Sequence, residues 1–216
     1  MSCRIRPVDT TAAYAEGFPA YYSGRAYQAR DVLTDVAAEL RQQHRLALEV
    51  EALFMLGLCH AMCGSAEQAN ECYVRVLEIT ESSGESVARS YAQWATGLLE
   101  WQHREFDRAT QLLDEALQRL ARLIVDPVGT AMCLEALAWI ACDTDDPERA
   151  AVLTGAAGAL ATAAGNWPIL SPNLLTSHTE CVRRAIAALG DAEFATARRA
   201  GEDMSGAAAV ALALGE

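Results

Sequence analysis

Lysine is absent from this sequence of 216 residues, so all seventeen of its basic residues are arginine. Without lysine the chain cannot carry the phosphate-loop lysine of a nucleotide-binding site, a Schiff-base lysine or a lysine general base. The basic residues are also outnumbered, because 29 aspartate and glutamate residues give a formal net charge of −12. An acidic surface repels a phosphate backbone, so we expect these residues to make no direct contact with nucleic acid.

Proline and long apolar runs are scarce as well. Only six prolines interrupt the chain, although 52% of its residues are hydrophobic. No run reaches the roughly 18 apolar residues that span a membrane, and "MSCRIRPVDTTAAYAEGF" lacks the apolar core of a signal peptide. The seven cysteines are odd in number and scattered, which is typical of a reducing compartment. We therefore predict a cytoplasmic, all-α protein with no membrane segment.

One short pattern occurs four times at a nearly constant distance. Its copies are "AYQARDVL", "AEQANECY", "FDRATQLL" and "DDPERAAVL". Aligned on a shared alanine, they follow each other in steps of 40, 40 and 41 residues, at Ala29, Ala69, Ala109 and Ala150. Twelve residues before each alanine stands another small residue, at Gly17, Gly57, Gly97 and Ala138. Larger residues follow four positions after three of the alanines, at Leu33, Tyr73 and Leu113, with Thr154 at the fourth.

Two antiparallel helices can approach closely where both side chains are small, so this spacing predicts a helix-turn-helix unit. Turn-forming sequences lie between the paired small residues, as "SGRAY", "CGSAE", "HREFD" and "DTDDPE". A fixed period in this range is typical of helical solenoids. The fold prediction is an all-α, right-handed α-solenoid of about four such units, with a period of 40–41 residues.

The paired small residues resemble those of the tetratricopeptide repeat, which has the same twelve-residue separation. That repeat is about 34 residues long, so each unit here would have helices longer by about one turn. An array of the HEAT type has the longer period and remains an alternative. We assign residues 1–165 to four repeats and 166–216 to a linker and C-terminal capping helices. In the latter, Leu174–Leu189 is a predicted helix that Gly190 ends, and Asp191 is a predicted cap for the next helix.

The last 90 residues or so have a more specific resemblance. Its pieces are "CLEALAW", "ERAA", "GAA", "LGDAEF" and "AVALAL". They are similar to a region of large bacterial, notably actinobacterial, LuxR-type transcriptional regulators that join an ATPase module to helical repeats and a DNA-binding helix-turn-helix domain. The chain has no phosphate loop, and no helix-turn-helix domain follows "AVALALGE". The resemblance therefore implies the repeat region alone, with a role in binding an effector or a partner protein.

In the tetratricopeptide register, the first helix of each unit lines a concave groove. The residues predicted to face it are mostly aromatic and apolar, and they are Phe54, Leu58, Tyr91, Trp94, Leu98, Trp101, Glu135 and Trp139. Such a groove suits an apolar small molecule or an amphipathic partner helix. The alternative is that these side chains pack between neighbouring helices.

Signals for chemistry are weak. Near His60, Cys59 and Cys63 lie one helical turn apart and could share a face, with Cys72 on the partner helix. Structural zinc sites usually have tighter pairs such as C-x-x-C, so we predict no metal. No H-E-x-x-H, G-x-S-x-G or dinucleotide-binding loop occurs, and we predict neither a cofactor nor enzymatic activity.

Three hypotheses remain open at this point. The first is a non-catalytic binding domain of a LuxR-type regulator, and the second is a stand-alone scaffold protein unrelated to transcription. The third is an enzyme whose groove holds a small substrate. A homo-oligomer is compatible with each of them.

Overall fold

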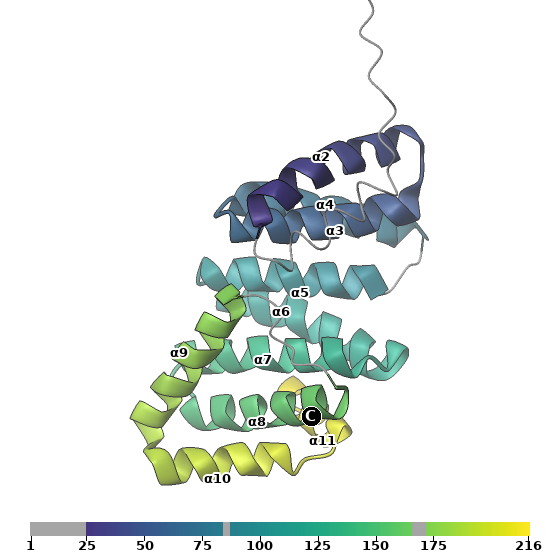
Figure 1. The fold of residues 1–216 in the computed structure, drawn as a ribbon. Coiled ribbons are helices and arrows are strands. Elements are labelled where there is room, and N and C mark those ends of the chain that lie inside the picture. The colour runs from purple at the N-terminus through teal and green to yellow at the C-terminus, as the bar shows by residue number, and fades with distance from the viewer. Residues whose placement is uncertain (1–24, 84–86, 166–171) are drawn as a thin grey trace, which may run out of the picture. The chain divides into compact units, whose positions relative to one another are not determined.

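The computed structural model describes residues 25–83, 87–165 and 172–216, and each element in these ranges is a helix (Figure 1). The predicted all-α class is therefore confirmed for the described residues. The chain separates into two compact units, Met1–Ala88 and Arg89–Glu216. The domain boundary that we predicted after residue 165 lies inside the second unit and stays a prediction. In the described part, no helix is both long and apolar enough to cross a membrane.

The first unit contains three described helices, α2 (Ala26–Gln42), α3 (Leu46–Met62) and α4 (Ala66–Ser83). Helix α3 packs against both of the others. Apolar side chains occur on most sides of α3, and a helix of this kind must be covered on most sides. Gly17 and the turn at 23–27 belong to the predicted first repeat, but residues 1–24 lie outside the described part of the chain.

A buried carboxylate ties the helices of the first unit together. Glu49 on α3 is 2% exposed, and its Oε1 lies 3.4 Å from Nε of both Arg41 on α2 and Arg75 on α4. A buried charge needs such partners, because an unpaired carboxylate would be strongly penalised away from water. The arginines therefore fix how α2 and α4 meet α3.

The second unit begins inside α5 and continues through six further α-helices and one π-helical turn. The elements are α5 (Val87–Gln102), α6 (Phe106–Gln118), η1 (Arg119–Ile124), α7 (Pro127–Asp143), α8 (Pro147–Ala163), α9 (Pro172–Leu189), α10 (Asp191–Glu202) and α11 (Gly206–Leu214). Helix α7 is central, because α6, η1, α8, α9 and α11 all pack on it. Every residue from Gly129 to Cys142 is buried, which explains why α7 has no polar face.

Capping residues set where α7 and α8 begin. Asp126 accepts hydrogen bonds from the backbone N–H of Val128 and Gly129, and Asp146 accepts one from Arg149. Each aspartate is followed by a proline at the first helical position, where the missing N–H does no harm. Helix α8 thus begins within "DDPERAAVL", the fourth copy of the repeated pattern.

The small residues of the repeat lie where the helices of a pair meet. Ala29, Ala69, Ala109 and Ala150 have no exposed surface, and neither has Ala138. A Cβ added to Gly97 would lie 3.0 Å from Cγ of Leu113, and one added to Gly57 would lie 2.4 Å from the ring of Tyr73. Tyr73 and Leu113, four positions after Ala69 and Ala109, thus occupy the space that Gly57 and Gly97 leave. This packing explains the spacing in the sequence.

The turns inside the helix pairs share one backbone geometry. Gly64, Arg104 and Asp145 each have a positive φ, between 60° and 75°, and they follow each other at the repeat period. One residue later, the N–H of Ser65, Glu105 and Asp146 donates to a carbonyl five residues back, at 2.9 Å in each case. This pattern is the Schellman helix ending, which needs a left-handed residue. The three turns are therefore structurally equivalent.

Helices α8 and α10 meet at two glycines that the sequence analysis left unassigned. A Cβ on Gly155 would lie 2.0 Å from the carbonyl oxygen of Arg198, and a Cβ on Gly201 would lie 1.9 Å from that of Val152. The two backbones are thus in direct contact. Both glycines are therefore required for the packing of α8 against α10.

The predicted helix at Leu174–Leu189 is confirmed, although it begins two residues earlier, at Pro172. Asp191 is the first helical residue of α10 and Gly190 is the cap, so the predicted capping role of Asp191 is wrong. Gly190 has a φ of 84°, which lets the chain turn between the two helices. The linker that we predicted at the start of residues 166–216 falls on residues 166–171, which lie outside the described residues.

The shared turn geometry can be tested by exchanging residues at positive φ. Gly64→Ala should lower the free energy of unfolding by about 1 kcal/mol, because alanine is strained there although its Cβ would touch nothing within 4 Å. His44→Gly, at a φ of 56°, should raise it by a few tenths to 1 kcal/mol. Urea denaturation checks both changes. If Gly64→Ala is as stable as the parent chain, the turn is not under the conformational constraint described.

The glycine contact between α8 and α10 predicts the opposite of the usual effect of replacing glycine by alanine in a helix. Gly→Ala inside a helix normally stabilises it by about 1 kcal/mol. Gly201→Ala should instead destabilise the protein by about 3 kcal/mol or more, because the two backbones must separate. Thr196→Ala, on the exposed side of α10, is the matched control and should leave the melting temperature nearly unchanged. A Gly201→Ala variant at least as stable as this control would contradict the close contact.

Candidate binding site

Two of the eight predicted groove residues, Phe54 and Leu58, lie on α3 in the first unit. Both are partly buried against the core of that unit, and the Phe54 ring lies 6.1 Å from the ring of Tyr73 between centroids. The remaining six lie in the second unit. The eight residues therefore belong to two different compact units.

Most of the six side chains in the second unit are interior. Trp94, Leu98, Glu135 and Trp139 are buried, and Tyr91 and Trp101 are partly buried. The Trp94 indole N–H donates to the carbonyl of Met132 at 3.2 Å, and the Tyr91 hydroxyl donates to Asp126 at 2.7 Å. These bonds join α5 to the first half of α7. Packing between helices, the alternative stated above, describes their present contacts.

Glu135 is the centre of a buried polar cluster. Its Oε1 accepts the indole N–H of Trp139 at 2.9 Å and lies 2.6 Å from Nδ1 of His178 on α9. Because an ionised carboxylate can only accept, we assign the shared proton to Nδ1 of His178. Glu135 is 3% exposed, so these donors replace the water that its charge has lost.

A second acidic residue on α7 repeats this arrangement two turns later. Asp143 accepts the Trp101 indole N–H at 2.7 Å with one oxygen and pairs with Arg184 of α9 through the other. Arg184 also donates to the carbonyl of Cys142 at 2.9 Å. The rings of Trp101 and Trp139 lie 5.2 Å apart between centroids, so the two clusters are continuous.

Helix α9 therefore covers the face of α7 that carries Glu135, Trp139 and Asp143 (Figure 1). Among the described side chains of α9, Cys181 and Ala185 are buried, and Val182, Ile186 and Leu189 pack against the cluster that contains Ala151 and Phe194. The face that we predicted for a partner helix holds a helix of the same chain. Any role of these residues in binding a separate molecule stays a prediction. His178 and Arg184 were missed as partners because only the fold brings them to α7.

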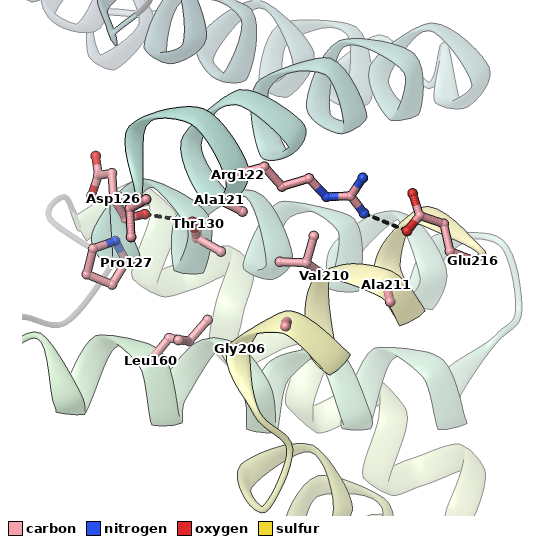
Figure 2. A pocket seen from close by; sticks show the side chains of 12 residues that line it. Ala121, Arg122, Asp126, Pro127, Thr130, Leu160, Gly206, Val210, Ala211 and Glu216 are labelled. Carbon is pink, nitrogen blue, oxygen red and sulfur yellow. Dashed lines mark hydrogen bonds and ion pairs between the residues drawn. The ribbon is translucent and has the colours of Figure 1, made fainter.

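An open cavity of about 570 Å³ lies elsewhere in the second unit, between η1, the start of α7, α8 and α11 (Figure 2). Its volume falls within the range of small-molecule sites. The wall is mainly apolar, and its residues are Ala121, Arg122, Val125, Asp126, Pro127, Thr130, Leu160, Gly206, Ala207, Val210, Ala211 and Glu216. None of the predicted groove residues is among them.

The polar groups of this cavity lie at its two ends (Figure 2). At one end the Asp126 carboxylate accepts from two backbone N–H groups and from Tyr91, and the Thr130 hydroxyl donates to the Asp126 carbonyl at 2.6 Å. At the other end, Arg122 pairs with Glu216 at 2.5 Å. The first set serves the start of α7, whereas the second joins η1 to the end of α11.

The backbone of the cavity wall is unusual. Helix α6 ends in the π-helical turn η1, a rare geometry that often occurs at functional sites. The next residue, Val125, has a φ of 59°, which is strained for a β-branched side chain. Val125 and Leu123 are each 75% exposed, so neither is held there by burial. The N–H of Asp126 donates to the carbonyl of Leu120 at 2.8 Å, so this left-handed residue ends the helix, as the positive-φ residues of the other turns do.

The cysteines of the first unit have no sign of metal binding among the described residues. No group of three or more histidine, cysteine or acidic side chains there could hold a metal ion. Burial raises the pKa of the Cys59 thiol to about 12 and that of Cys72 to about 11, so both remain protonated at neutral pH. Protonated, buried thiols behave as small apolar residues.

One carboxyl group in the second unit has a raised pKa. Burial raises the pKa of Asp114 on α6 to about 6, and Arg149 on α8 opposes the shift. Its buried Oδ1 has no hydrogen-bond partner among the described atoms. Arg149 instead donates to the carbonyl of Ala213 at 2.8 Å, which holds the end of α11. Asp114 does not line the cavity, so we treat it as a determinant of stability.

No protein-family model, curated protein or solved structure matches the chain.

The contact between α9 and α7 can be tested at His178. His178→Ala should lower the free energy of unfolding by about 1–3 kcal/mol, because it removes a donor from the buried Glu135 carboxylate. Arg183→Ala, on the exposed side of α9, is the control and should cost less than about 0.5 kcal/mol. Equal losses in the two variants, measured by urea denaturation, would show that α9 is not held by the Glu135 cluster.

Asp114 makes the stability of the protein depend on pH. Because its pKa is raised in the folded chain, folding disfavours its ionised form, and stability falls as pH rises from about 4 through about 6. Asp114→Asn removes this penalty. The variant should be more stable than the parent by about 1 kcal/mol at pH 7.5, after allowance for solvent screening, and the gain should vanish near pH 4. A gain that is independent of pH would contradict the burial of this carboxylate.

Proposed function

We propose that this chain is a non-catalytic, tetratricopeptide-like helical repeat domain that binds a small, largely apolar effector. The observation that carries the proposal is the cavity of about 570 Å³ at α11, whose wall is apolar except at its ends. Apolar walls provide affinity through burial, and a few polar groups provide orientation. In this proposal α3–α4, α5–α6 and α7–α8 are successive repeats of an α-solenoid, and α9–α11 cover the last of them.

An exposed apolar side chain in the cavity wall supports the same conclusion. Val125 lines the cavity and is 75% exposed. A bound molecule that covers it would bury apolar surface that is otherwise in contact with water.

The biological setting that we propose is the repeat region of a bacterial LuxR-type transcriptional regulator. The support is the resemblance of "CLEALAW", "ERAA", "LGDAEF" and "AVALAL" to that region. Binding in the cavity would act on α11, because Val210, Ala211 and Glu216 form one of its walls. The protein would then sense the effector, and other parts of the regulator would respond.

A stand-alone scaffold protein is the second candidate. One observation favours it, namely that α9 already lies as a helix on the aromatic and acidic face of α7. A partner helix with basic residues at similar spacing would suit the same face. In that case the cavity would be incidental.

The binding proposal can be tested by a thermal-shift screen of apolar small molecules. A ligand that binds only the folded chain raises the melting temperature as its concentration increases. Ala211→Trp, which puts a large side chain into the cavity wall, should abolish the shift. Ala187→Trp, on the exposed side of α9, should retain it. The proposal fails if no compound shifts the parent chain, or if Ala211→Trp keeps the full shift.

A further inference from the structure

The chemical class of the ligand can be inferred from the polar groups that the cavity leaves available. The Asp126 carboxylate is engaged by three donors, and the Thr130 hydroxyl is engaged by a backbone carbonyl. Both groups serve the first turn of α7, where a carboxylate also suits the positive end of the helix. A ligand has little to gain from either of them. The remaining polar feature is the ion pair between Arg122 and Glu216.

The two members of this pair are unequally placed. Arg122 lies in the last turn of η1, where the carbonyl end of a helix favours a cation. Glu216 follows α11, and its backbone N–H donates to the carbonyl of Ala211 at 3.0 Å. Its carboxylate therefore lies at the carbonyl end of α11, where an anion is disfavoured. The cation is held in a favourable position and its anionic partner is not.

The pair is also easily separated. Both side chains are 47% exposed, and ion pairs with this exposure add little to stability. Arginine can present two parallel N–H groups to a carboxylate, and a rigid ligand meets that geometry with less loss of side-chain freedom than a glutamate does. An incoming carboxylate can thus replace Glu216 at small cost to the fold.

We propose that the cavity binds an amphipathic monocarboxylate, whose carboxylate displaces Glu216 from Arg122 while its apolar body lies against Leu160, Pro127 and Val210 (Figure 2). This proposal rests on the binding function given above and adds the ligand class to it. The net charge of −12 does not exclude an anion, because salt at physiological ionic strength screens exposed charges that lie more than about 8 Å away. Arg122 is the charge that the ligand meets at contact.

The test is isothermal titration of the full chain with three probes of equal length, decanoate, decanol and decylammonium, each below its micelle concentration. Decanoate should bind at least tenfold more tightly than either of the others. Arg122→Gln should reduce decanoate binding to the level of decanol and leave decanol unchanged. Circular dichroism of the variant confirms that it is folded.

Glu216→Gln provides the more specific measurement. Because Glu216 competes with the ligand for Arg122, its removal should strengthen decanoate binding several-fold and leave decanol unaffected. The control pair is Arg183 and Glu180 on α9, which form a somewhat more exposed ion pair away from the cavity. Arg183→Gln and Glu180→Gln should not alter the binding of any probe.

The outcomes separate the ligand class from the binding function. Equal or tighter binding of decanol or decylammonium would overturn the carboxylate proposal and leave the binding proposal standing. Weaker decanoate binding by Glu216→Gln would also overturn it. If none of the probes and no compound of the apolar screen binds, both proposals fail.

Discussion

The close approach of helices at small residues is the constraint on which this structure depends. Ala69, Ala109 and Ala150 are fully buried. A Cβ on Gly97 would lie only 3.0 Å from Cγ of Leu113, which is closer than ordinary contact. In the α3–α4 and α5–α6 pairs, the glycine of one helix makes room for Tyr73 or Leu113, four positions after the alanine of the other. The Schellman turns then return the chain at the same place in each repeat, which gives the period of 40–41 residues. The direct contact of Gly155 with α10 extends the same principle beyond the repeats.

Structural features that depend on one helix pair could be predicted from the sequence. Contacts between segments far apart in the sequence could not. The small residues, the turns and the start of α8 at Pro147 depend on neighbours within about twenty residues, so their spacing is visible in the sequence. The pairing of His178 with Glu135 spans 43 residues and has no periodic signature. The cavity was missed for a different reason. Its apolar wall residues are indistinguishable from core residues until the fold leaves space between them.

The side of α7 that faces α9 differs from the start of α7 in how its polar groups are used. Along one side, Glu135 and Asp143 accept the tryptophan indole N–H groups and pair with His178 and Arg184 of α9, so these hydrogen bonds are already used. At the start of α7, the chain leaves an open apolar cavity, a strained Val125 and an ion pair whose anion is poorly placed. Interior aromatic residues had attracted our attention in the sequence. The ligand that we propose would lie instead against Arg122 and α11.

The most direct test of the packing constraint is the free energy of unfolding of four variants, in which Ala29, Ala69, Ala109 and Ala150 are each replaced by leucine. Since all four have no exposed surface, each variant should lose about 1–3 kcal/mol through overpacking. Leucine at the exposed Ala38 and Ala187 should change the value by less than about 0.5 kcal/mol. If the buried positions tolerate leucine as well as the exposed ones do, close contact at small residues does not determine this fold.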